Sequence, residues 1–400
     1  MSAATDPPVD HGRTTLPWCS FVRHDDPQRI RRVGVGLDHG VVDVAAALPE
    51  LADLFDDGTL DALLALDAPA RSAVRTRLLE AVDAGLLDAH RTPVGEVDLL
   101  LAWTVRDYVD FYASEHHAGI VGRIFRPGTD PLPRAWKHLP IGYHGRAGSV
   151  VVSGTPVTRP RGQRREDDAV VFGPSTRLDF EAEVGFVVAG PPGCGPLSLR
   201  EAEERLFGVC LVDDWSARDL QAWEYVPLGP FLGKSFATSV SPWIVPIEAL
   251  EAARVAPPER DVPLQPYLDD TGAPLGGLDL RLEVRVNDVV VSRPPFASTY
   301  WTAAQMLAHL CVNGAPVRPG DLFASGTVSG PRPDQRGALI ELTWDGTEPL
   351  TMPGGTTLAY LRDGDEVTIS ATAPGLDGTV VHLGAVAGRI HPAEDLPKPS

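Results

Sequence analysis

Residues 178–184 read LDFEAEV and alternate strictly between apolar and acidic side chains. This pattern constrains the fold more than any other in the chain. Successive side chains of a β-strand point to opposite faces, so Asp179, Glu181 and Glu183 share one face of a predicted strand. Carboxylates held that close repel each other. The strand therefore lies either at a solvated sheet edge or beside a cation, and the pattern alone leaves both open.

The rest of the chain predicts more short strands. Gly and Pro contribute 39 and 38 of the 400 residues, which favours turns over long helices. A hairpin is predicted at 33–44 and helices between 51 and 87, within a small α+β domain at 1–105. A mostly β domain is predicted for 106–400. Its strand-like runs are 149–153, 169–172, 177–188, 206–213, 280–291, 338–344 and 363–372.

Composition excludes several classes of function. The net charge of −19 would repel a nucleic-acid backbone. No apolar run approaches the roughly 20 residues that span a membrane, and the first residues lack the apolar core of a signal peptide. None of the four cysteines forms a C-x-x-C pair, so neither a zinc site nor a disulfide framework is indicated. We expect a soluble, cytoplasmic protein that binds neither nucleic acid nor membrane.

Two segments combine acids with other polar side chains. The run RDYVDFYASEHHAGIVGRIFR places Asp110 and Tyr112 near the pair His116–His117. Either histidine is a candidate base, although lone histidines are more often structural. In DDWSARDLQAWEY, a helix after Asp214 would put an arginine and a glutamine, three residues apart, on one face. The alternative for that segment is a surface helix with ordinary ion pairs.

Further along, Glu341 lies in ALIELTW, which we predict to be an apolar strand. An unpaired buried carboxylate is unfavourable, so Glu341 needs a partner, and a protonatable histidine is a natural one. If the other acids converge, they need a cation, because two like charges at 4 Å repel by about 4 kcal/mol at an effective dielectric near 20. Oxygen ligands without cysteine favour Mg²⁺ or Ca²⁺.

The chain resembles the fumarylacetoacetase family over long strings. These include DYVDFYASEHHAGIVGRIFR, WKHLPIGYHGRAGSVVVSGTPV, LDFEAEVGF, DDWSARDLQAWEYVPLGPFLGKSFATSVSPW, VNGAPVRPGDLFASGTVSGPRP and LIELTW. The resemblance implies a mixed β-roll catalytic domain after a small SH3-like N-terminal domain, and a homodimer. It also implies that the acidic residues bind a metal ion.

By this resemblance the site residues fall at defined positions. The metal ligands are Asp110, Glu181, Glu183 and Asp214, with Lys234 and Thr238 beside the cation. The general base is His117, oriented by Glu341, with Arg218, Gln221 and Lys234 around the reacting oxygens. The substrate contacts are Tyr112, Arg126, Tyr143, Gln221, Tyr225 and Thr327.

The implied reaction is metal-dependent hydrolysis of a carbon–carbon bond in a β-diketo dicarboxylic acid. Fumarylacetoacetate and water give fumarate and acetoacetate, the last step of tyrosine and phenylalanine degradation. One alternative is another member of the superfamily, such as an acylpyruvate hydrolase, a decarboxylase or a hydratase. Another is a non-catalytic calcium-binding protein, which would leave His117 and Glu341 without a purpose.

Overall fold

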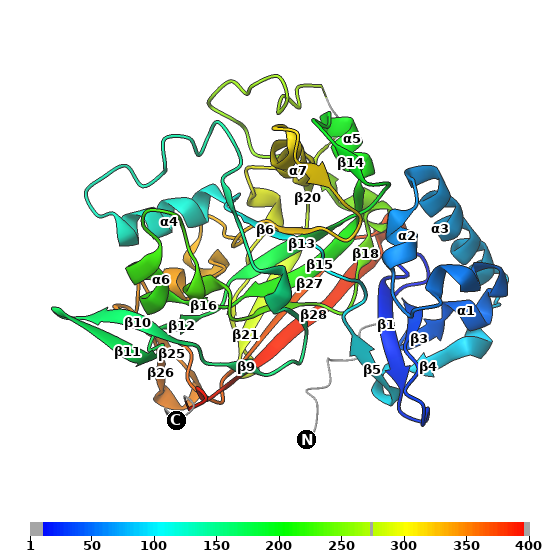
Figure 1. Ribbon diagram of the computed structural model, residues 1–400, viewed down its shortest axis with the longest axis horizontal. Helices are drawn as coiled ribbons and strands as arrows, with labels where there is room; N and C mark the ends of the chain where they lie inside the picture. Colours follow the sequence, from blue (N-terminus) through cyan, green and yellow to red (C-terminus); the bar gives the residue numbers. More distant parts are fainter. Residues whose placement is uncertain (1–10, 273–274, 396–400) are drawn as a thin grey trace, which may run out of the picture.

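The computed structural model describes residues 11–272 and 275–395 and shows a mixed α+β chain that is rich in strands (Figure 1). This confirms the expected fold class. Residues 1–10, on which most of the expectation about a signal peptide rests, lie outside the described residues, as do residues 396–400 of the predicted second domain. Among the described residues, no helix is both long and apolar enough to cross a membrane.

The first part of the chain forms an antiparallel sheet in the order β4-β3-β2-β1-β5. Its strands are β1 (Trp18–Arg23), β2 (Arg32–Leu37), β3 (Gly40–Asp43), β4 (Arg91–Pro93) and β5 (Val97–Leu100). The predicted hairpin is present, because Leu37 pairs with Gly40 and Asp38 turns the chain with φ +49°. Helices α1 (Val44–Ala47), α2 (Asp61–Ala65) and α3 (Ala68–Asp83) lie between β3 and β4. The domain boundary at residue 105 stays a prediction.

The central sheet is mixed and runs in the order β7-β6-β24-β13-β15-β17-β8, with β18 also paired to β15. Its strands are β6 (Tyr108–Phe111), β7 (Gly142–His144), β8 (Val150–Val152), β13 (Ala182–Val188), β15 (Leu206–Asp214), β17 (Thr238–Val240), β18 (Val245–Pro246) and β24 (Leu322–Ala324). β13 is antiparallel to both its neighbours, whereas β24 runs parallel to β6. The predicted strand 177–188 is therefore interrupted: Glu183 lies in the middle of the central sheet, whereas Asp179 belongs to the short strand β12 (Leu178–Asp179) and Glu181 lies between the two strands.

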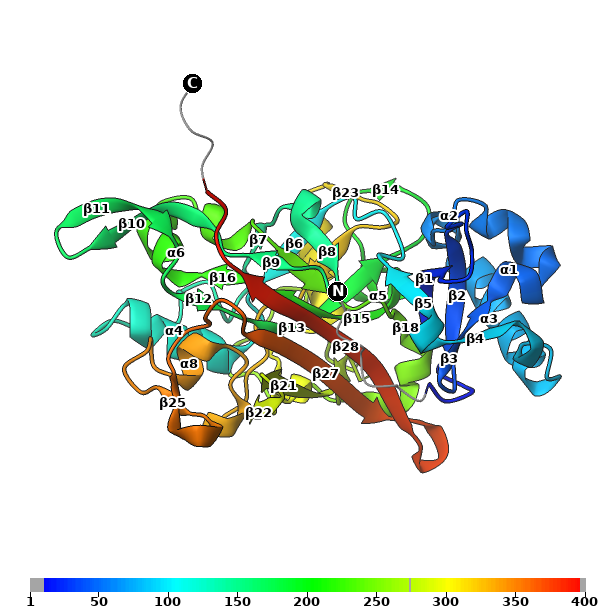
Figure 2. The same cartoon turned by 90° about the horizontal axis from the view of Figure 1, so that it is seen from below.

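A second sheet has the strand order β22-β21-β27-β28-β9. Its strand β28 packs against β15 of the central sheet (Figure 2). Its strands are β9 (Val157–Thr158), β21 (Arg281–Val286), β22 (Val289–Ser292), β27 (Glu366–Pro374) and β28 (Val380–His391). The predicted run 280–291 is thus a hairpin, turned by Asn287 and Asp288 with positive φ. The pair Asn287–Asp288 is a turn signal within this run, which the prediction of one strand overlooked.

The two faces of the central sheet have different partners. Val184 and Phe186 of β13 belong to the core shared with the second sheet. On the other face, Val187, Cys210 and Leu322 pack with the N-terminal sheet. Glu183 and Asp214 have the parity of this second face, because strand side chains alternate. Helices α4 (Glu115–Phe125) and α6 (Arg218–Glu224) lie at the end of the molecule that is remote from the N-terminal sheet (Figures 1 and 2).

The segment 338–344 corrects one prediction. It forms the short helix α8 (Leu339–Leu342) and not a strand, because a short apolar run fits either structure. The remaining elements are α5 (Leu199–Glu204), α7 (Ala303–Cys311) and the paired strands β10 (Arg161–Glu166) with β11 (Ala169–Pro174), β12 (Leu178–Asp179) with β16 (Ser216–Ala217), β14 (Gly193–Cys194) with β23 (Pro316–Val317), β19 (Arg254–Val255) with β20 (Gly277–Leu278), and β25 (Leu350–Thr351) with β26 (Thr357–Leu358).

Candidate metal centre and active site

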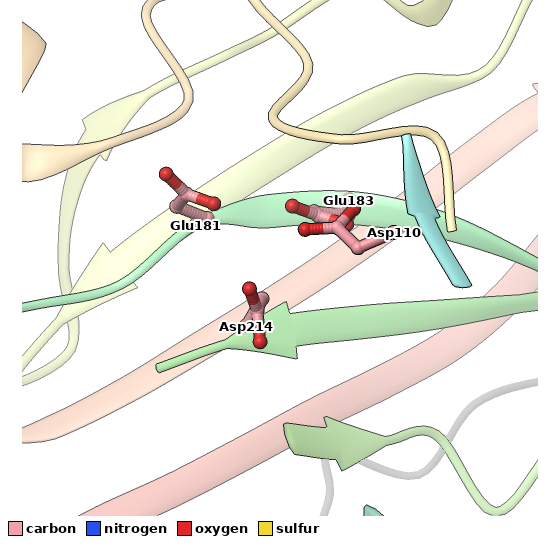
Figure 3. Close-up of side chains that lie close together, drawn as sticks. All are labelled: Asp110, Glu181, Glu183 and Asp214. Carbon is pink, nitrogen blue, oxygen red and sulfur yellow. The ribbon is translucent and has the colours of Figure 1, made fainter. Parts of the chain in front are cut away.

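Strand register brings four acids to one point. Asp110 ends up beside β13 because it pairs with Ala324, which in turn pairs with Gly185. Glu181 precedes β13, Glu183 lies in it, and Asp214 ends the adjacent β15 (Figure 3). One oxygen from each of Asp110, Glu181, Glu183 and Asp214 lies within 4.8 Å of the others, and all four residues are buried. The cluster fits a divalent cation.

The electrostatics of the cluster support that fit. Burial, and then the charges of Asp110 and Asp214, raise the pKa of Glu183 well above its usual range. Burial and the Asp214 charge do the same to Asp110. Among residues 11–272 and 275–395, no donor reaches either oxygen of Glu183 or Oδ1 of Asp110. Buried carboxylate oxygens without donors are the groups that a hard cation would satisfy.

Lys234 lies within the cluster. Its ammonium donates to Glu181 and, at 2.6 Å, to Asp214. Burial disfavours the charge on Lys234, but Asp214 and Glu181 outweigh burial and raise its pKa. Thr238 donates to Asp214 Oδ1 at 3.0 Å, and the Tyr143 hydroxyl donates to Oδ2 at 3.1 Å. Asp214 is therefore held from three directions.

A buried guanidinium borders the cluster on the side of α6. Arg218 donates from Nη2 to Glu181 Oε1 at 2.7 Å and from Nη1 to Gln221 Oε1 at 3.1 Å. The predicted helical spacing of Arg218 and Gln221 is confirmed. Although burial raises the pKa of a carboxylate, the charges of Lys234 and Arg218 hold the pKa of Glu181 below its usual range.

A histidine and a glutamate face each other beside the acids. His117 lies in the first turn of α4, where Ser114 caps the helix by accepting the His117 N–H. Nδ1 of His117 lies 2.9 Å from Glu341 Oε2, and Nε2 lies 3.8 Å from Glu181 Oε1. The Ser329 hydroxyl donates to the Glu341 carboxylate at 2.9 Å. The imidazole therefore lies between the Glu341 carboxylate and the cluster, although the approach of Nδ1 to Glu341 does not have the angle of a hydrogen bond.

These groups open into a cavity of about 350 Å³. Asp110, Glu181, Lys234, Arg218 and His117 contribute to its wall. All the predicted substrate contacts line it too, namely Tyr112, Arg126, Tyr143, Gln221, Tyr225 and Thr327. Glu183, Asp214, Thr238 and Glu341 are buried behind this wall. The structure thus brings every predicted site residue to one place, and the roles of these residues stay predictions.

Two alternatives from the sequence are wrong. The acidic strand is not a solvated edge, because Asp179 and Glu183 are fully buried and β13 has a partner on each side. The segment after Asp214 is not an ordinary surface helix, because Arg218 is only 3% exposed and each of its three guanidinium nitrogens donates to an acceptor. His116 is only half buried, outside the cavity wall.

Sequence reasoning missed two contacts. Ser329 holds Glu341, but nothing in the turn 325–331 distinguished its hydroxyl from that of Ser325. Asp179 was counted with the acids of its strand, yet it bonds to Arg218 and to two backbone N–H groups of α8. No local pattern could have revealed these partners, since they lie 39, 160 and 161 residues away.

The fold and the acidic centre define a class of carboxylate-lined metal protein built on a mixed β-roll. A family model, fumarylacetoacetate (FAA) hydrolase C-terminal, matches residues 107–390. The chain is 40% identical to a fumarylacetoacetase of Bos taurus over 94% of this chain and 95% of that protein. It is 43% identical to one of Arabidopsis thaliana over 86% and 85%. The chain belongs to the fumarylacetoacetate hydrolase family.

Solved structures share the fold at lower identity. A fumarylacetoacetate hydrolase of Exiguobacterium antarcticum aligns with a TM-score of 0.55 and 18% identity, over 95% of this chain and 100% of that chain. A maleylpyruvate hydrolase of Sphingobium sp. SYK-6, solved with manganese(II) and pyruvate, aligns with a TM-score of 0.53 and 15% identity, also over 95% and 100%. At this identity the likeness concerns the fold alone.

Proposed function

We propose that this enzyme hydrolyses fumarylacetoacetate to fumarate and acetoacetate, in the degradation of tyrosine and phenylalanine. The observation that carries the proposal is the His117–Glu341 pair beside four buried carboxylates at one cavity wall. Similarity to fumarylacetoacetases along nearly the whole chain supports the same activity. A non-catalytic calcium-binding protein is excluded by this similarity.

The four carboxylates would hold Mg²⁺ or Ca²⁺, both of which prefer oxygen ligands. Lys234, in the cavity wall, and Thr238, behind it, both donate to Asp214 and fix its orientation. When bound, such a cation supplies positive charge toward the oxygens of the diketone, which makes a carbon leaving group easier to expel. The preference for one of the two ions depends on the flexibility of the ligands, so the experiment uses both ions.

His117 acts as the general base. A proton on Nδ1 would face the Glu341 carboxylate, which lies 2.9 Å away, and would leave the Nε2 lone pair for the cavity. Nε2 removes a proton from water, and the hydroxide attacks the carbonyl on the fumaryl side. The carbon–carbon bond breaks with its electron pair on the acetoacetate carbon. The proton held by His117 returns to that carbon.

Donors around the cavity stabilise the charge that develops on the attacked carbonyl oxygen. Lys234, Gln221 and Arg218 are held in place before substrate binds, so they need little reorganisation. Arg126 is half buried in the wall and is the best partner for a substrate carboxylate. Tyr112, Tyr143, Tyr225 and Thr327 line the remaining surface. The buried Thr327 hydroxyl has no hydrogen-bond partner in the part of the chain that the structure describes, so it is available to substrate.

The test is the loss of diketone absorbance with purified protein. Metal-stripped protein should be inactive, and Mg²⁺ or Ca²⁺ should restore turnover. An acylpyruvate assayed side by side distinguishes the alternative activity within the superfamily. Faster turnover of the acylpyruvate, or unchanged activity after chelation, would contradict the proposal.

We also propose a cytoplasmic homodimer. Cys19, Cys210 and Cys311 are free and buried, which fits a reducing compartment. A candidate dimer face lies on the β10–β11 hairpin, on α6 and on the segment that follows α6, where Phe172, Trp223 and Leu232 line one hollow. All three are at least 44% exposed. Exposed apolar patches of this kind mark interaction surfaces, and an isologous dimer would cover the patch on both copies.

A further inference from the structure

Asp179 bonds to two parts of the active site that are far apart in sequence. Its carboxylate is fully buried at the end of β12. Oδ1 accepts the backbone N–H groups of Phe180 at 2.8 Å and Leu339 at 2.7 Å. Oδ2 accepts the N–H of Ile340 at 3.1 Å and Nε of Arg218 at 2.7 Å. An ionised carboxylate accepts about four hydrogen bonds, so Asp179 has no capacity left for a metal.

On one side Asp179 sets the orientation of the guanidinium. A guanidinium is planar, so fixing Nε fixes the directions of Nη1 and Nη2. With Nε held by Asp179, the two Nη groups reach Gln221 and Glu181 in the cavity wall. A neutral or displaced group at 179 would free Arg218 to rotate about its own side chain. The charge that Arg218 offers to substrate therefore depends on Asp179.

On the other side Asp179 fixes the start of α8. This helix is only four residues long, and its N-cap residue, Ala338, has no side chain that can cap it. The N–H groups of Leu339 and Ile340, which have no partner within the helix, are satisfied by Asp179. Glu341, which follows directly, faces His117. The placement of the orienting carboxylate thus also depends on Asp179.

We infer that Asp179 is a positioning residue that aligns Arg218 and the Glu341–His117 pair through one carboxylate. It touches neither substrate nor metal and acts through these groups. The inference rests on the proposed function for its kinetic readout only. Contacts that orient catalytic groups from behind typically change activity about 10- to 100-fold when removed.

The experiment compares Asp179→Asn with Asp321→Asn. Asp321 is a matched control, because it is also buried and accepts a backbone N–H and an arginine Nε, both from Arg318. It does not line the cavity. Asparagine at 179 would point an N–H toward one of the four donors. We expect kcat to fall about 10- to 100-fold with KM within about threefold, while Asp321→Asn keeps its kcat. A kcat loss shared by both variants would overturn the inference.

A double-mutant cycle with Glu341→Gln tests the coupling. If Asp179 acts through α8, its substitution should lower kcat much less in the Glu341→Gln background than in the native one. Multiplicative losses would overturn the inference. Amide hydrogen exchange gives a readout without substrate. Leu339 and Ile340 should exchange about tenfold faster in Asp179→Asn and unchanged in Asp321→Asn.

Amide hydrogen exchange also tests this inference independently of the proposed function. If native protein fails to consume the substrate, the proposed function fails, while the exchange rates still decide whether Asp179 fixes α8. Should Asp179→Asn not fold, Arg218→Lys replaces it, since lysine keeps the charge but lacks the Nε donor to Asp179. The amides of α8 should then exchange faster because Asp179 loses an anchor. Unchanged exchange would overturn the inference.

Discussion

At the scale of single residues, charge balance explains the composition of the site. Arg218 neutralises Asp179, with Nε donating to Oδ2 at 2.7 Å. Lys234 neutralises part of the remaining cluster through Glu181 and Asp214. The oxygens of Glu183 accept no hydrogen bond from any residue that the structure describes, and the charge of Lys234 does not outweigh the effect of burial and of the neighbouring acids on the pKa of Glu183. Burying unpaired charge is highly unfavourable, so the cluster is stable as carboxylates only with a cation bound.

The base can be assigned by comparing the two adjacent histidines. His117→Ala should lower kcat at least about 100-fold, because general-base catalysis contributes about 10² to 10⁴. Metal binding should persist, since all four carboxylates remain. His116→Ala is the matched control on the next position of α4, half buried and outside the cavity wall. Steady-state kinetics with calorimetric metal titration measures both effects. A larger loss in His116→Ala would move the assignment to His116.

At the scale of elements, some features could be predicted from local pattern and others could not. The alternation at 178–184 correctly placed Glu181 and Glu183 toward one site, and the hairpin at Asp38 followed from its turn residues. The burial of β13 could not be predicted, since it depends on β15 and β24 pairing from distant sequence. Helix α8 was missed because its short apolar run fits either a helix or a strand, and the residue that satisfies its first N–H groups, Asp179, lies far away in the sequence. The burial of β13 and the formation of α8 therefore both depend on contacts between residues that are far apart in the sequence.

We predict that Gly326, which follows β24, is essential because its backbone lies against the end of β6. Gly326 has φ +75°, and a Cβ there would lie 2.1 Å from the Phe111 carbonyl oxygen. Gly326→Ala should therefore destabilise the protein by more than about 3 kcal/mol, and weaken metal binding by displacing Asp110 next to Phe111. Gly354→Ala is the control, with φ +84° and open space around the added carbon. It should cost about 1 kcal/mol. Urea unfolding measures both, and equal losses would contradict the steric argument.

At the scale of the whole molecule, His11 ties the start of the described chain to both parts of the fold. Its backbone pairs with Asp38, and its ring packs 4.4 Å from that of Trp243. Burial, with the charge of His382 and a smaller effect of His39, lowers the pKa of His11 from 6.5 to about 3. The folded state therefore disfavours the protonated form of His11. Above pH 6.5 His11 is neutral in both the folded and the unfolded protein, so its protonation then costs no stability.

This pKa shift predicts acid sensitivity. Because the folded pKa lies below the unfolded one, stability is lost as pH falls from 6.5 toward 3. Between pH 7 and pH 5 the loss from His11 should be about 2 kcal/mol. His11→Phe keeps an aromatic ring against Trp243 and should remove that part of the pH dependence. The exposed His90→Phe is the control. Urea unfolding at both pH values measures the difference, and parallel curves for native protein and His11→Phe would contradict the prediction.

The last prediction concerns the candidate dimer face. A stable dimer buries about 800 Å² on each copy, and a charge placed at the centre of that area must be desolvated without a partner. Phe172 lies in β11 and is 56% exposed, and it lines the hollow with Trp223 and Leu232 but not the active-site cavity. Phe172→Asp should therefore shift the protein from dimer to monomer in light scattering at micromolar concentration, without unfolding it. Val380→Asp, at a position that is 54% exposed in β28, should remain a dimer. If both variants stay dimeric, the interface lies elsewhere on the molecule, and a monomeric native protein would refute the dimer itself.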